Sequence, residues 1–235
     1  MRYVIAISLA ALVSIAVPPV MAQSDGIAVP IRKAPYHVPV FENEFVTLLN
    51  IYVPPQRNTG YHTHAEDSVS VNIEDADMTN QDWGQPQPGP AQRGERGRAT
   101  FTAYSKQSPR THKASNVGPT PFHNVSFIFK PAQPGRFRPS LRAEAAGYLQ
   151  VMDNERVRGW RLVLESGQSV PAITQEAPGI RIVVSGGELV ESGPGPVDRA
   201  MNLKLGEFYW QDPGVRRAVR NIGTTRLELV EFELK

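Results

Sequence analysis

Two histidines stand one residue apart in the stretch GYHTHAED, namely His62 and His64. Side chains at positions i and i+2 of a β-strand lie on the same face, about 7 Å apart along the strand. Imidazoles at this spacing chelate one cation, and a third imidazole would complete a three-histidine site. His112 is the candidate third ligand, and a divalent Zn, Fe, Cu, Ni or Mn ion suits such donors. The alternative is an inert histidine pair on an exposed loop.

The composition restricts the remaining possibilities. The chain has 235 residues, no cysteine and a formal net charge of +2. Without cysteine there are no disulfides, and a metal must use histidine, carboxylate or water ligands. No basic run is present, which argues against nucleic acid as a partner. The 19 glycines and 21 prolines predict many short strands and turns.

The N-terminus has the pattern of a signal peptide. Arg2 precedes an apolar run that ends before Pro18, and small side chains follow near Ala22. We therefore predict a signal peptide over residues 1–22 and an exported protein, periplasmic or secreted, without a stable membrane anchor after cleavage. The run is too short to predict a good membrane-spanning helix.

The chain contains two internal matches in the same order, which predicts a tandem duplication. VFENEFV (residues 40–46) recurs as VMDNERV (151–157), and HKASNVGPTPFHNVSFIFK (112–130) aligns without a gap to RAVRNIGTTRLELVEFELK (217–235). The residue alternation within these segments is typical of half-buried strands. We predict an N-terminal barrel over residues 23–130, a linker over 131–147 and a C-terminal barrel over 148–235. The Gly/Pro-rich insert at 82–98 is either a simple connection or a lid.

These motifs resemble those of the cupin superfamily. GYHTH followed by acids is similar to the first cupin motif, and HKASNVG is similar to the second. Together with the duplication, they make the chain resemble a bicupin, which implies an all-β fold of two tandem jelly-roll barrels. The resemblance implies metal ligation by His62, His64 and His112.

The carboxylate of the first motif departs from the family pattern. A glutamate is expected four or five residues after the second histidine, where this chain has Ser68 and Val69. Asp67 is the candidate fourth ligand if a bulge or a tighter turn corrects its facing. A three-histidine site without a carboxylate is the other option. Glu66 or Asp67 is a candidate general base if neither binds metal.

The second half carries no equivalent histidines. Ile173 and Gln175 align with His62 and His64, and Arg217 aligns with His112. We therefore expect the C-terminal barrel to lack metal and to be structural, to bind a ligand through Arg217 or to seal a dimer.

Two further histidines lie outside the metal set. His123 shares the parity of Val125 and Phe127, so we expect it to face the barrel interior as a hydrogen-bonded residue of the ligand pocket. His37 precedes the repeat, and we expect it at the surface. Asn116 and Asn221 are predicted to stabilise equivalent turns.

The resemblance implies three functions. The first is an enzyme, a metal-dependent oxygenase of the quercetin-dioxygenase kind that acts on a small molecule. The second is a non-catalytic exported bicupin that binds a small ligand or a partner chain, and the third is a structural or storage role. A homodimer through strand edges is compatible with all three.

Overall fold

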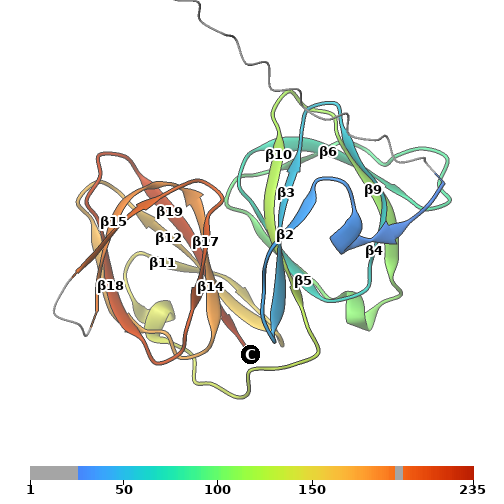
Figure 1. The fold of residues 1–235 in the computed structure, drawn as a ribbon. Helices are drawn as coiled ribbons and strands as arrows, with labels where there is room; N and C mark the ends of the chain where they lie inside the picture. The colour runs from blue at the N-terminus through green and yellow to red at the C-terminus, as the bar shows by residue number, and fades with distance from the viewer. Residues whose placement is uncertain (1–25, 194–197) are drawn as a thin grey trace, which may run out of the picture.

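The computed structural model describes residues 26–193 and 198–235, so the predicted signal peptide lies outside the described residues. Almost all regular structure is β-strand, as the alternation predicted. The strands form two jelly-roll barrels, each built from two facing sheets (Figure 1). None of the described helices has the length and apolar character needed to span a bilayer.

The first barrel contains the strands of residues 29–129. One sheet has the order β1 (Val29–Pro30), β4 (Asn58–His64), β9 (Arg110–Asn116), β6 (Ala76–Asp82) and β7 (Gln92–Gly94). The other has the order β2 (His37–Glu42), β3 (Val46–Val53), β10 (Phe122–Phe129), β5 (Ser68–Asn72) and β8 (Ala99–Thr102). Two single-turn helices, η1 (Ile31–Lys33) and η2 (Tyr104–Lys106), lie in the connections.

The second barrel contains the strands of residues 148–234. One sheet has the order β11 (Tyr148–Asp153), β12 (Val157–Leu164), β19 (Leu227–Leu234), β14 (Gly179–Ser185) and β17 (Phe208–Gln211). The other has the order β13 (Ser169–Thr174), β18 (Arg216–Asn221), β15 (Gly187–Ser192) and β16 (Arg199–Leu203). A connector that carries η3 (Leu141–Glu144) joins the barrels.

Each barrel contains the same kind of turn, and an equivalent asparagine stabilises it in both. Asn116 donates to the carbonyls of Val53 and Thr120 and accepts from the Gly118 amide. Asn221 makes the matching bonds to Leu164, Thr225 and Gly223. Both asparagines are buried, so each one satisfies backbone groups that would otherwise be unpaired. The turn role predicted for these two residues is confirmed.

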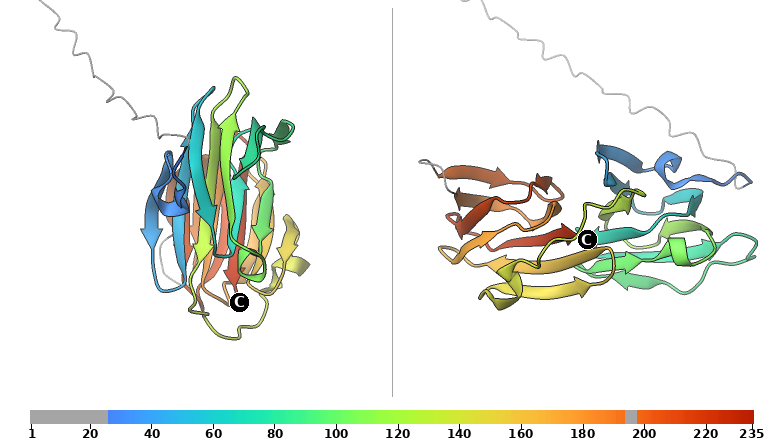
Figure 2. Two further views of the ribbon diagram at one scale, coloured as in Figure 1. Left: turned by 90° about the vertical axis from the view of Figure 1, so that its right-hand side faces the viewer. Right: turned by 90° about the horizontal axis from the view of Figure 1, so that it is seen from below.

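The largest apolar cluster lies between the barrels. One face of β3, β5 and β10 packs against one face of β12, β14 and β19, and the barrels stand side by side (Figure 2). Val125, Phe127 and Phe129 belong to this face, and the Phe127 and Phe232 rings meet at 5.1 Å. The opposite faces of the same strands therefore line the two barrel interiors.

Candidate metal centre

Two antiparallel strands bring the three histidines together. β4 pairs with β9 so that His62 lies opposite His112, and strand alternation puts His64 on the same face as His62. The pairing breaks between Asn58 and Tyr61, where Gly60 has a φ of 61°. Glycine takes this left-handed conformation without steric cost, and the Asn58 side chain accepts a 2.9 Å bond from the Gly60 amide. Gly60 thus forms an irregularity inside β4, directly before the two histidines.

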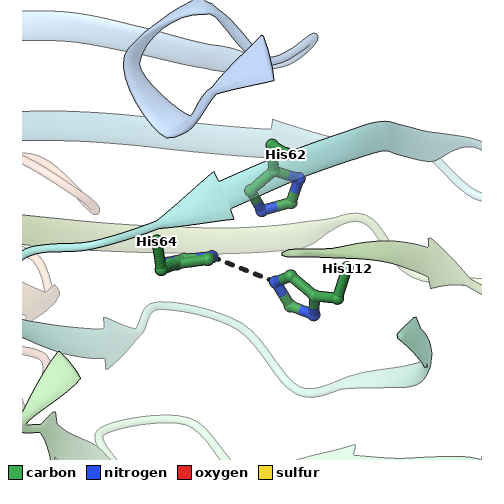
Figure 3. A group of neighbouring side chains, drawn as sticks. All are labelled: His62, His64 and His112. Carbon is green, nitrogen blue, oxygen red and sulfur yellow. Dashed lines mark hydrogen bonds between the residues drawn. The ribbon is translucent and has the colours of Figure 1, made fainter. Parts of the chain in front are cut away.

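The three imidazole rings converge on one point (Figure 3). The ring centroids of His62, His64 and His112 lie 4.7 to 5.0 Å apart, and the candidate ligand nitrogens all lie within 4.8 Å of one another. Nε2 of His64 is 3.0 Å from Nε2 of His112. Nδ1 of His62 is 3.2 Å from the Gly60 carbonyl oxygen, to which it donates when protonated. Its Nε2 then keeps the free lone pair.

The site keeps its imidazoles neutral. Burial is the main cause, because it penalises the charged form, and repulsion among the clustered histidines adds to it. The pKa of His62 is lowered to about 3, that of His64 to about 4 and that of His112 to about 2. Neutral imidazole is the form that binds metal, so the site is ready for a cation at neutral pH.

The donor set fits a divalent transition-metal ion. Two imidazole nitrogens bound at about 2.1 Å to one ion are roughly 3.0–3.4 Å apart, and the Nε2 atoms of His64 and His112 are at 3.0 Å. Three imidazoles without a carboxylate suit the metals that favour nitrogen ligands. Nδ1 of His112 is buried and has no partner among the described residues.

The structure does not bring Asp67 into this group. Its side chain is buried, but Oδ1 accepts a 2.8 Å bond from the amide of Ser105. That bond anchors the segment of Tyr104, whose ring stacks on His64 at 4.8 Å. Asp67 therefore supports the site through Tyr104. Glu66 lies outside it as well, 3.6 Å from Arg32 in a half-exposed ion pair.

His37 is a site residue that the sequence analysis placed wrongly at the surface. Its side chain is 7% exposed, and its ring centroid lies 4.8 Å from that of His62. Nδ1 lies 2.9 Å from the Pro35 carbonyl oxygen, which fixes the ring. Burial lowers the pKa of His37. The alternation of β2 could have predicted this position. His37 and Val38 point to opposite faces of this edge strand, and the face of His37 is the one toward the barrel interior.

The histidines line a cavity of about 370 Å³ in the first barrel. Its walls include Ile51, Phe122 and Tyr104, together with side chains of β5 and β10. The 82–98 insert contributes Gln92, Arg93, Gly94 and Arg98. The insert therefore forms part of the cavity wall and is more than a connection.

The fold and the cavity can be compared with known proteins. No family model matches the sequence, and no curated protein sequence matches it. Among solved structures, AerE from Microcystis aeruginosa is similar over 86% of this chain and 98% of its own, with 13% identity and a TM-score of 0.53. A cupin 2 conserved barrel domain protein from Leptotrichia buccalis is similar over 85% and 88%, with 9% identity and a TM-score of 0.50.

The chain has the bicupin fold. Salicylate 1,2-dioxygenase from Pseudoaminobacter salicylatoxidans, solved in complex with gentisate, is also similar. The match covers 84% of this chain and 73% of that one, with 13% identity and a TM-score of 0.56. Identities this low show the fold alone.

The second barrel has other side chains at the histidine positions. Ile173 pairs with Arg217 at the register at which His62 pairs with His112. Arg217 donates to Gln211 and lies 4.0 Å from Glu191, beside a space of about 10 Å³. Such a space holds about one water molecule, so it does not admit a larger ligand.

His123 does not face the barrel interior, contrary to the prediction. It lines a groove of about 430 Å³ with Gly206, Phe208 and Tyr209 of the second barrel, and its Nε2 is 2.9 Å from Oδ1 of Asn50. Its parity with Val125 is as predicted, but that face of β10 packs between the barrels. His123 and Arg217 therefore share no pocket.

Proposed function

We propose that this bicupin is a metal-dependent dioxygenase of the quercetin-dioxygenase kind, which acts on a small molecule in the first barrel. One observation carries the proposal: three neutral imidazoles, two of them buried and that of His64 partly buried, converge on the wall of a 370 Å³ cavity. A cavity of this volume suits a small-molecule substrate. A purely structural histidine cluster would not need such a space beside it.

The protein side chains would hold and orient the reactants. His62, His64 and His112 would hold the metal, and a redox-active ion bound to them would supply the chemistry of oxygen activation. His37 packs against His62, and Tyr104 stacks on His64, so both rings hold their neighbours in orientation. Arg110 lines the cavity with its guanidinium 2.8 Å from Asp82.

The comparisons support this proposal at the level of fold. Salicylate 1,2-dioxygenase has the same tandem arrangement and was solved with gentisate, a small molecule. The asymmetry of the two barrels also supports it, because Ile173 and Arg217 stand at the histidine register in the second barrel and the space that they line there is about 10 Å³. We assign the second barrel a structural role.

Metal analysis and oxygen uptake test the proposal together. We expect the protein, purified without chelator or nickel affinity, to carry close to one redox-active Fe, Mn, Cu or Ni ion per chain. His62→Ala and His112→Ala should lose the ion, whereas His123→Asn, outside the cavity, should keep it. Oxygen consumption with small aromatic substrates should follow metal content. A wild-type chain that takes up no metal, even after reconstitution, refutes the dioxygenase.

We also propose that the protein is exported. The support is the sequence of residues 1–22 alone. Mass spectrometry of the periplasmic protein should give a chain that begins near Gln23. An intact N-terminus in the cytoplasmic fraction contradicts export and leaves the proposed activity unaffected.

A further inference from the structure

The interior face of β5 and β10 is unusually polar for the inside of a barrel. Each strand alternates between a face toward the second barrel and a face toward the cavity. The outer faces are apolar, with Val69, Val71, Val125 and Phe127. The cavity receives serines and asparagines instead, and these are Ser68, Ser70, Asn72, Asn124 and Ser126.

Four of these side chains form a hydrogen-bonded row. The Ser70 and Ser126 hydroxyls are 2.9 Å apart, Ser126 donates to Asn124 Oδ1 at 2.7 Å, and Asn124 donates to Asn72 Oδ1 at 3.0 Å. Asn124 and Ser126 are 2% and 3% exposed. Buried polar groups carry a desolvation cost unless they are paired, so this row gives the cavity an ordered polar wall.

The second barrel shows what happens to the cavity when these positions carry large side chains. Ser70 pairs with Ser126 across β5 and β10, and Arg181 pairs with Glu231 at the same place across β14 and β19. Arg181 and Glu231 form a buried ion pair and fill their barrel. The space left there is about 10 Å³, against about 370 Å³ in the first barrel. Small polar residues thus keep the first barrel open.

The charges on the cavity wall are all positive. Among the described residues that line it there is no aspartate or glutamate, but there are three arginines. Arg93 is paired with Asp75 and Asp77, and Arg110 is paired with Asp82. The third is Arg98, which has no acidic partner among the described residues.

Arg98 lies next to the polar row. Its carbonyl accepts a 3.0 Å bond from the Asn72 amide, and strand alternation puts Arg98 on the same face as Thr100, which lies opposite Ser70. Its guanidinium is therefore a cation that a ligand can neutralise. The apolar part of the wall continues the same sheet beyond the row: Ile51 of β3 pairs with Asn124, and Ile31 and Phe122 pack in the same cluster as Ile51.

We propose that the first barrel binds a small organic carboxylate, with its charged group at Arg98 and the Ser/Asn row and its apolar body against Ile31, Ile51 and Phe122. A guanidinium with neighbouring hydroxyl and amide donors is the arrangement that recognises a carboxylate. The cavity volume equals that of about a dozen water molecules, which suits a ligand with one ring. The inference rests on the proposed function, because it names the substrate class of that site.

Calorimetric titration of matched ligand pairs tests the carboxylate. The probes are benzoate, 2-hydroxybenzoate and 3-phenylpropanoate, each beside its neutral primary amide. We expect at least one acid to bind about tenfold or more tightly than its amide, since hydrogen bonds to a charged group are the stronger ones. Arg98→Gln should abolish this preference. Arg57→Gln, which changes an exposed arginine outside the cavity wall, should keep it.

A second pair of variants tests the polar row. Ser126→Ala should keep the fold, because it removes a single hydroxyl, and should weaken acid binding several-fold. Ser70→Arg/Ser126→Glu copies the ion pair of the second barrel and should abolish ligand binding while the chain keeps its metal. If the double variant does not fold, as judged by circular dichroism, Arg98→Gln and Ser126→Ala decide the matter alone.

The outcomes separate this inference from the proposed activity. If no acid binds more tightly than its amide, or if Arg98→Gln leaves the preference intact, the carboxylate assignment is overturned. Metal content and oxygen uptake are measured on the same samples. A protein that prefers acids but binds no metal leaves this inference standing and refutes the dioxygenase. A protein that binds metal and takes up oxygen but shows no preference for acids refutes this inference and leaves the dioxygenase standing.

Discussion

Arg181 and Glu231 form a buried ion pair across β14 and β19, with Nε of the arginine 2.7 Å from Oε1 of the glutamate. Both side chains are almost fully enclosed, and Arg142 of the connector bonds the other glutamate oxygen at 2.8 Å. The connector thus inserts a side chain into the second barrel. With Glu191 beside Arg181 and Glu233 beside Arg142, five charged side chains and their hydrogen bonds occupy the space that a ligand would take.

Removal of the Glu231 charge should destabilise the second barrel. After Glu231→Gln, Arg181 keeps Glu191 and Arg142 keeps Glu233, but the two arginines lose the counter-ion that they share. The free energy of unfolding should therefore fall by about 1.5–3 kcal/mol. Denaturant unfolding followed by tryptophan fluorescence measures this, with exposed Glu188→Gln as the control. A loss below about 1 kcal/mol would mean that the network is more hydrated than its burial indicates.

Much of the fold follows from the sequence because its signals are local and repeated. Alternation of residue types predicts strands without knowledge of their partners. The matched segments around Asn116 and Asn221 predict that both halves fold alike, and both asparagines make the same three bonds. The spacing of His62 and His64 predicts a shared face, and His112 joins them because the second motif begins the partner strand.

The wrong predictions concern residues whose strand face is predicted by alternation but whose packing partner is not. Parity puts His123 and Phe127 on one face, but it does not say whether that face looks into a barrel or against a neighbouring one. His37 has Tyr148 at the equivalent position in the second barrel, so the repeat gave no sign of its role. The cavity side of β5 and β10 is polar, which no rule of an apolar interior predicts.

Substitution of Asp67 tests whether its carboxylate positions the Tyr104 segment or binds the metal. Asp67→Asn keeps an oxygen that accepts from the Ser105 amide, so stability and metal content should both stay close to wild type. Asp67→Ala leaves that amide unpaired and should cost about 1–3 kcal/mol in unfolding free energy, again without loss of metal. Metal analysis and thermal unfolding report the two effects. Loss of the ion in Asp67→Asn would instead identify the carboxylate as a ligand.

Replacement of His37 tests whether this residue binds the metal or only packs against His62. His37→Phe keeps a ring against His62 but leaves the Pro35 carbonyl unpaired, so we expect a loss of about 1 kcal/mol in stability and an unchanged metal stoichiometry. His112→Phe makes the same change within the triad and should abolish metal binding. Equal metal loss in both variants would make His37 a fourth ligand.

The pH dependence of metal binding follows from the lowered pKa values of the triad. Protons compete with a metal for imidazole only below the pKa of the ring. An unshifted histidine with a pKa near 6.5 would start to release metal below that pH. In the folded protein the pKa values are about 3 for His62, about 4 for His64 and about 2 for His112. Metal affinity should therefore stay nearly constant from pH 7 to about pH 5 and fall below about pH 4.

The same shifts give the metal-free protein an acid-sensitive stability. The unfolded histidines take up protons as the pH falls below 6.5, whereas the folded ones stay neutral until the pH reaches their lowered pKa values. The unfolded state then binds more protons, so unfolding becomes easier as the pH falls from about 6.5 toward 4. Thermal unfolding of metal-free protein across this range should show the decline, and His62→Gln should reduce its slope. A flat profile, or metal release that begins near pH 6.5, would show that the triad is hydrated and not buried.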